Sequence, residues 1–80
     1  MQLYWVSFIL ILNGTKEPVS FGLSEPYDSI DKAKIAIEFH RNNHTVLSAW
    51  IDTFDENDKK TTVFHECYLN AVGNIVKPSI

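Results

Sequence analysis

The first apolar run covers positions 3–12 (LYWVSFILIL), where both alternating sets of side chains are apolar. Alternate residues of a strand point to opposite faces of a sheet, so this run predicts a strand that is central or covered on both faces. Asn13 and Gly14 follow directly, and this dipeptide favours a tight two-residue turn. The start of the chain therefore predicts a buried strand that enters a hairpin.

Positions 17–23 (EPVSFGL) have the alternation of a returning strand. Its apolar set is Val19, Phe21 and Leu23. Pro18 cannot donate a hydrogen bond to a neighbouring strand, and Gly22 weakens a strand interior. We therefore expect this second strand to lie at a sheet edge or to contain a bulge.

A helix is predicted from about position 30 to position 42. Ser29 can cap its free amide groups, and the charge of Asp31 is favourable in the first turn. At 100° per residue, an apolar arc forms on one side, and two further apolar residues flank it. This arc is wider than one sheet face requires, so we expect a loop or a second copy of the chain to cover part of it. The arc contains Ile30, Ala33, Ala36, Ile37 and His40, and its flanks are Ile35 and Phe39.

Two more strands, at 45–54 and 61–69, are separated by the polar stretch 55–60 (DENDKK), which predicts a hairpin. An even loop would set Trp50 opposite His65 and Ser48 opposite Cys67, whereas an odd, bulged loop would set Trp50 opposite Phe64. Sequence leaves this register open. We expect the smaller residues Leu47, Ala49 and Ile51 to face the helix.

The element order is β-β-α-β-β, and a turn at Gly73-Asn74 could lead into a short fifth strand at 75–76. The predicted fold is therefore α+β, an antiparallel sheet of four or five strands with one α-helix packed on a face. We expect positions 1–80 to form a single domain.

Composition narrows the possible functions. The chain has 80 residues, is 45% hydrophobic and carries a net charge of −3, which is unlike a disordered chain and gives no basic footprint for nucleic acid. The apolar run at 3–12 is far shorter than the roughly 20 residues that span a bilayer. We expect neither nucleic acid nor a membrane as a partner. Since Cys67 is the only cysteine, we expect a cytoplasmic protein without a disulfide. The size and composition are those of a compact bacterial or phage accessory protein.

The most reactive side chains stand close together at His65, Glu66 and Cys67. Period-two geometry puts His65 and Cys67 on the same face of their strand. A nucleophilic thiol also needs a lowered pKa and a group that orients its base, and no motif supplies either, so we expect Cys67 to be a small core residue. A small metal- or thiol-dependent domain that uses Cys67 and His65 is the alternative hypothesis, with His40 and His44 as further candidate zinc ligands.

An acidic turn offers a third hypothesis, in which the chain presents carboxylates to a nucleic-acid-binding surface of another protein. The carboxylates are Asp52, Asp55, Glu56 and Asp58. The turn lacks the central Gly and the final Glu of a calcium-binding loop. We expect it to be a solvated hairpin tip.

Ten aromatic side chains in 80 residues exceed what one small core holds, while catalytic constellations are missing. Exposed Trp and Tyr are favoured as anchors of interfaces. The preferred hypothesis is a non-enzymatic protein-interaction module, without cofactor or metal, that binds another protein or forms a homodimer. It would use an aromatic sheet face or the helix surface. The predicted binding residues are Trp50, Tyr68 and Phe39, with Trp5 next.

Overall fold

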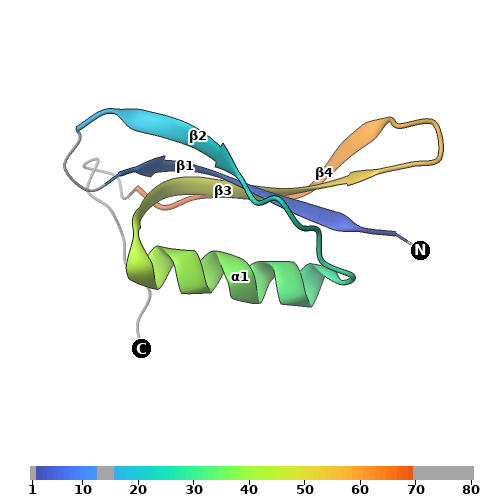
Figure 1. Cartoon of the computed structure of the whole chain (residues 1–80), viewed down its shortest axis with the longest axis horizontal. Helices are drawn as coiled ribbons and strands as arrows, with labels where there is room; N and C mark the ends of the chain where they lie inside the picture. Colours follow the sequence, from blue (N-terminus) through green and yellow to red (C-terminus); the bar gives the residue numbers. More distant parts are fainter. Residues whose placement is uncertain (1, 13–15, 70–80) are drawn as a thin grey trace.

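The computed structural model describes residues 2–12 and 16–69, which form one antiparallel sheet and one helix (Figure 1). The predicted order β-β-α-β-β and the α+β class are confirmed. The elements are β1 (Tyr4–Ile11), β2 (Pro18–Gly22), α1 (Ile30–Asn43), β3 (Thr45–Phe54) and β4 (Lys60–Cys67). The expected turns at Asn13-Gly14 and Gly73-Asn74, and the fifth strand at 75–76, lie outside the described residues. No helix in the described ranges is long and apolar enough to cross a membrane.

The strand order in the sheet is β2-β1-β3-β4. β1 is central, as its two apolar sets predict, and β2 is an edge strand, as Pro18 and Gly22 predict. The backbone groups of Leu23 face β1, because its N–H donates to the carbonyl of Val6 at 3.0 Å. Backbone groups alternate in direction along a strand, so those of Pro18, Ser20 and Gly22 face the free edge. The missing N–H of Pro18 therefore leaves no bond of the sheet unmade.

Helix α1 begins and ends where local chemistry favours it. The Ser29 hydroxyl accepts a hydrogen bond from the Lys32 amide at 3.1 Å and caps the first turn. At the other end, the N–H of His44 donates to the carbonyl of His40. The sharp turn into β3 follows directly, because Thr45 is already in the strand.

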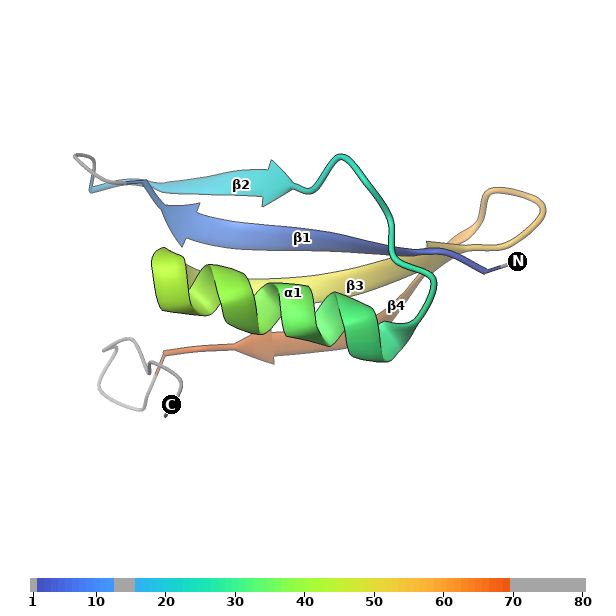
Figure 2. The ribbon, with the colours of Figure 1, turned by 60° about the horizontal axis from the view of Figure 1, so that its bottom comes forward.

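The helix packs on β1 and β3, and it leaves the helix-facing surface of β2 uncovered (Figure 2). Its lateral position is fixed before its first residue, because Tyr27 and Tyr4 exchange two backbone hydrogen bonds of 2.8 Å. This bridge holds the β2–α1 connection against the start of β1. The buried apolar core between helix and sheet consists of Val6, Phe8, Leu10, Ala33, Ile37, Val46, Ala49, Ile51 and Tyr68.

One expected core position is wrong. Ala49 and Ile51 are buried against the helix, but Val46 takes the place expected for Leu47, which is only half-buried. The cause is an irregularity between Ile9 and Leu10, where the pairing of β1 with β3 skips Leu47. A bulge of this kind inserts one extra residue, so the alternation of side chains on one side of the bulge is out of phase with that on the other side.

The register of β3 and β4 is now settled. Trp50 lies opposite His65 and Ser48 opposite Cys67. Near the hairpin tip the pairing shifts between Ile51 and Asp52, so the odd spacing at the tip is corrected by a bulge within β4. The hairpin therefore has the odd spacing at its tip and the pairing of Trp50 with His65 farther along.

Candidate functional site

The four predicted binding residues lie in three different places. Trp5 and Trp50 are half-buried on the sheet face opposite α1, which we call the open face. Phe39 lies on the helix and is 63% exposed. Tyr68 is only 3% exposed and belongs to the core. The structure therefore does not join these four side chains into one surface.

Tyr68 is covered by the helix rather than presented to a partner. The guanidinium carbon of Arg41 lies 3.7 Å from the centre of the Tyr68 ring, a cation–π distance. Arg41 is held there by Glu38, whose carboxylate oxygens lie 3.0 and 3.2 Å from its Nη1. Burial, with the nearby charge of Glu66, raises the pKa of Tyr68 to about 12, although Arg41 opposes this shift. The phenol is therefore neutral at physiological pH and packs as a core ring.

The open face carries both apolar and polar side chains. Strand pairing puts Ser7 beside Trp50 and Trp50 beside His65, whose ring lies edge-on at 6.1 Å from the indole. Ile9 and Ser48 form the next row, which ends at Cys67. Trp5 lies opposite Asp52 and Trp50 opposite Ser7, so the two indoles are diagonal neighbours and each has a polar residue directly across from it.

The thiol hypothesis finds little support in this geometry. His65 and Cys67 share the open face, as period-two alternation predicts, and Cys67 is an exposed free thiol. The expectation that Cys67 packs in the core is therefore wrong. Across the sheet the pair lies opposite Trp50 and Ser48, neither of which is a cation that could activate a thiol.

The four candidate zinc ligands are divided by the sheet. His40 and His44 stack at 5.8 Å near the end of α1, while His65 and Cys67 lie on the open face. Tetrahedral zinc sites need four ligands around one ion. Within residues 2–12 and 16–69, no three His, Cys, Asp or Glu side chains gather where they could hold a metal.

Two carboxylates of the acidic turn accept hydrogen bonds from within the hairpin. Asp52 is buried and accepts a hydrogen bond of 2.6 Å from the Thr62 hydroxyl. The Asp55 carboxylate accepts from the amides of Asn57 and Lys59 at 2.8 and 2.9 Å, which closes the hairpin tip. Asp58 adopts a φ of 61°, a conformation that Asp tolerates in turns. The pattern fits the expected hairpin tip better than an acidic binding surface.

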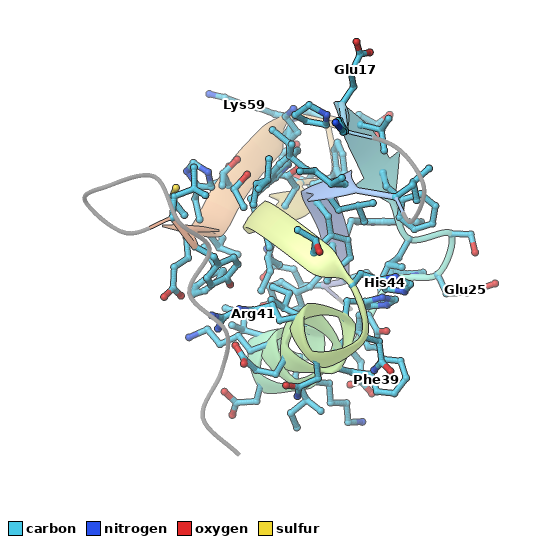
Figure 3. All side chains as sticks on the ribbon, turned by 90° about the vertical axis from the view of Figure 1, so that its left-hand side faces the viewer. Glu17, Glu25, Phe39, Arg41, His44 and Lys59 are labelled. Atoms are coloured by element: carbon cyan, nitrogen blue, oxygen red, sulfur yellow. The ribbon has the colours of Figure 1, made fainter. Side chains whose placement is uncertain are left out.

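An apolar hollow lies along the β2 flank of α1. It has a volume of about 510 Å³ and is lined by Tyr27, Lys32, Ile35, Ala36, Phe39 and His40. A smaller hollow of about 120 Å³ also has His40 in its wall and is lined by Leu10, Leu12, Phe21 and His44 as well. We call these two hollows, which share His40, the apolar groove. Seen along the helix, Phe39 and His44 lie on the flank toward β2 and Arg41 on the flank toward β4 (Figure 3).

On the opposite flank of α1, charged side chains border a hollow of about 310 Å³ and cover the aromatic rings beside it. The Lys34 ammonium lies 4.9 Å from the centre of the Phe64 ring, just as Arg41 covers Tyr68. Long basic side chains can cover apolar rings with their stems while their charges stay in water. On the groove flank, no Lys or Arg side chain of residues 2–12 and 16–69 is seen over Ile35 and Phe39, which are 69% and 63% exposed. Basic side chains therefore cover aromatic rings on the β4 flank of α1, whereas Ile35 and Phe39 on the β2 flank stay exposed.

Sequence reasoning found part of the groove and missed the rest. The excess width of the helix arc, with Ile35 and Phe39 at its flanks, was the signal that was available. Tyr27 and Phe21 were missed, because they reach the groove only through the placement of the β2–α1 connection and the edge strand. Phe39 is the one predicted binding residue that lies in the groove.

His40 lines both hollows, and its pKa is shifted from the usual value. Its ring lies 4.9 Å from Phe8 and 5.5 Å from Phe39. Burial lowers the pKa of His40 below its usual 6.5, and the neighbouring His44 lowers it further. The other titratable groups that line the same hollow are Tyr27 and Lys32.

This shift predicts acid sensitivity. The unfolded chain binds a proton at His40 at higher pH than the folded chain, so the stability is fully present above about pH 6.5 and falls as the pH drops below it. Urea unfolding between about pH 8 and 5 should show this loss. The His40→Gln variant should have a flatter profile, and His65→Gln, which changes an exposed ring, should keep the wild-type slope. Equal slopes for His40→Gln and wild type would contradict the assignment.

Comparison with known proteins adds no relative. No family model, curated protein or solved structure matches this chain.

Proposed function

We propose that this chain is a non-enzymatic protein-binding module whose binding surface is the apolar groove. One observation carries the proposal: Ile35 and Phe39 project from α1 beside an open apolar hollow of about 510 Å³. Contiguous exposed apolar surface is unfavourable in water and is typical of interaction sites.

The chemistry of the groove supports a protein partner over other ligands. Its exposed side chains are aromatic or aliphatic, and Lys32 at its border is paired with Asp28 at 3.0 Å. Nucleic acid would require basic side chains that are available to phosphates. The net charge of −3 also disfavours contact with nucleic acid or with anionic lipid. Because the chain has a single cysteine, we place its action in a reducing compartment such as the cytoplasm.

The groove is favoured over the open face because of exposure. Trp5 and Trp50 are already half-buried among their neighbours, whereas Ile35 and Phe39 are mostly exposed. A partner therefore gains more by covering the helix residues, since the free energy of burial scales with the apolar area removed from water.

The test is an affinity capture with three baits, read out by mass spectrometry. Wild type should enrich a discrete protein, including untagged copies of this chain if they are present. Phe39→Ser should lose that protein, and Trp50→Ala, which alters only the open face, should retain it. Loss with Trp50→Ala and retention with Phe39→Ser would move the site to the open face. Capture of nothing by a folded wild-type bait would overturn the proposal.

A further inference from the structure

The apolar groove has a projecting part and a hollow part of the same chemistry. Ile35 and Phe39 lie one turn apart on α1 and form a ridge along it. The larger hollow lies beside this ridge, between Tyr27, Ala36 and His40. A ridge next to a hollow of matching polarity is self-complementary, because a two-fold rotation exchanges the two parts.

We propose that the groove binds the groove of a second copy of this chain, so that Ile35 and Phe39 of each copy enter the hollow of the other. This inference rests on the proposed function and names the partner of the same site. The two-fold axis runs parallel to α1, along the boundary between ridge and hollow. A two-fold axis across the helix would set ridge against ridge. The α1 helices of the two copies are therefore parallel.

The exposed apolar area is close to what a stable dimer needs. Five side chains on this side of the sheet are exposed: Leu12 by 46%, Val19 by 38%, Phe21 by 47%, Ile35 by 69% and Phe39 by 63%. A large apolar side chain has on the order of 150–200 Å² to bury, so these fractions amount to roughly 400–500 Å² per chain. Two copies that cover all five completely would withdraw about 800–1,000 Å², which comes close to the threshold for a specific interface before any polar border is counted.

The distribution of charge permits the approach of two acidic chains. Lys34 and Glu38 line the hollow on the β4 flank, and Arg41 lies over Tyr68 on the same flank. On the groove flank, Lys32 is neutralised by Asp28. Two copies that meet through the groove therefore bring no unpaired like charges of these residues together, and self-association should depend only weakly on salt.

The first test measures the oligomeric state by sedimentation equilibrium over a wide range of concentrations. Wild type should reach a dimer, and the double variant Ile35→Ser with Phe39→Ser should associate roughly 30-fold more weakly or not at all. Phe54→Ser is the matched control, because Phe54 is 43% exposed but does not line the groove. A monomeric wild type at every concentration would overturn the second copy as partner, as would equal losses in Phe54→Ser and in the double variant.

The second test examines the exchange of ridge and hollow. The double variant has lost its ridge but keeps Tyr27, Ala36 and His40 around the hollow, while Ala36→Trp keeps the ridge and fills the hollow. Each variant alone has no complete contact, whereas a mixture regains one of the two. Association in the mixture should therefore be stronger than in either variant alone. A mixture no stronger than its components would overturn the proposed arrangement, and circular dichroism of each variant confirms that it is folded.

The capture experiment separates this inference from the proposed function. If wild type is monomeric but captures another protein that Phe39→Ser loses, the groove is a binding site and the second copy is the wrong partner. If wild type is monomeric and captures nothing, both proposals fail.

Discussion

Replacing Phe8 with alanine should lower the free energy of unfolding by about 3–5 kcal/mol. Phe8 is completely buried at the centre of the sheet and is among the largest fully buried side chains of the core. Its removal loses the free energy of burial and leaves a cavity that β1 and β3, which hold it on the central ladder, cannot close by moving. Since a domain of this size has a total stability of about 4–12 kcal/mol, the variant should be close to unfolded.

Urea unfolding followed by tryptophan fluorescence and circular dichroism measures this effect. Phe21→Ala is the control, because Phe21 lies directly opposite Phe8 on β2, faces the same side and is 47% exposed. We expect it to cost about 1 kcal/mol or less when measured at a low protein concentration that excludes self-association. Equal losses at both positions would contradict the burial that separates them.

Replacing Ile37 with alanine should lower the free energy of unfolding by about 2–4 kcal/mol. Ile37 is 1% exposed and is the largest side chain that α1 buries fully in the sheet. The loss of its methyl groups weakens the attachment of the only described helix. The same denaturation measurement applies, with far-UV circular dichroism reporting on the helix itself.

Ile35→Ala removes the same atoms from the same helix but at a position that is 69% exposed. Its stability should stay within about 0.5 kcal/mol of wild type, because an exposed side chain has little burial to lose. Its self-association should nevertheless weaken, since Ile35 is part of the ridge. A large loss of stability at Ile35, equal to that at Ile37, would show that the helix packs on a different side.

The lateral position of the helix explains why basic side chains cover aromatic rings on one flank and not on the other. The bridge between Tyr4 and Tyr27 fixes the start of the helix beneath β1. From there α1 follows β1 and β3. Lys34 therefore comes within reach of the Phe64 ring, and Arg41 within reach of the Tyr68 ring. Across the other flank β2 has no helix above it. The apolar groove therefore depends on where the short β2–α1 connection places the helix.

Tyr68 illustrates what a strand pattern leaves open. Aromatic residues on a predicted strand are reasonable binding residues, and alternation alone does not say which face is covered. In the structure, the Tyr68 amide donates to the carbonyl of Leu47 at 2.8 Å, and this bond sets its ring toward the helix. Arg41 then covers the ring. Both partners are distant in sequence, so no local pattern could have found them.

The sequence by itself determined the order of the elements, their approximate bounds, the cap at Ser29, the central place of β1 and the edge position of β2. Each of these depends on periodicity, on a single backbone donor or on a side chain three residues away, and all such effects act over a few positions. The tertiary structure decided the bulge at Leu47, the register of Trp50 with His65 and the exposure of Phe39 beside an open groove. These features depend on contacts between residues far apart in the chain, and a shift of one residue in any strand pairing would reverse them.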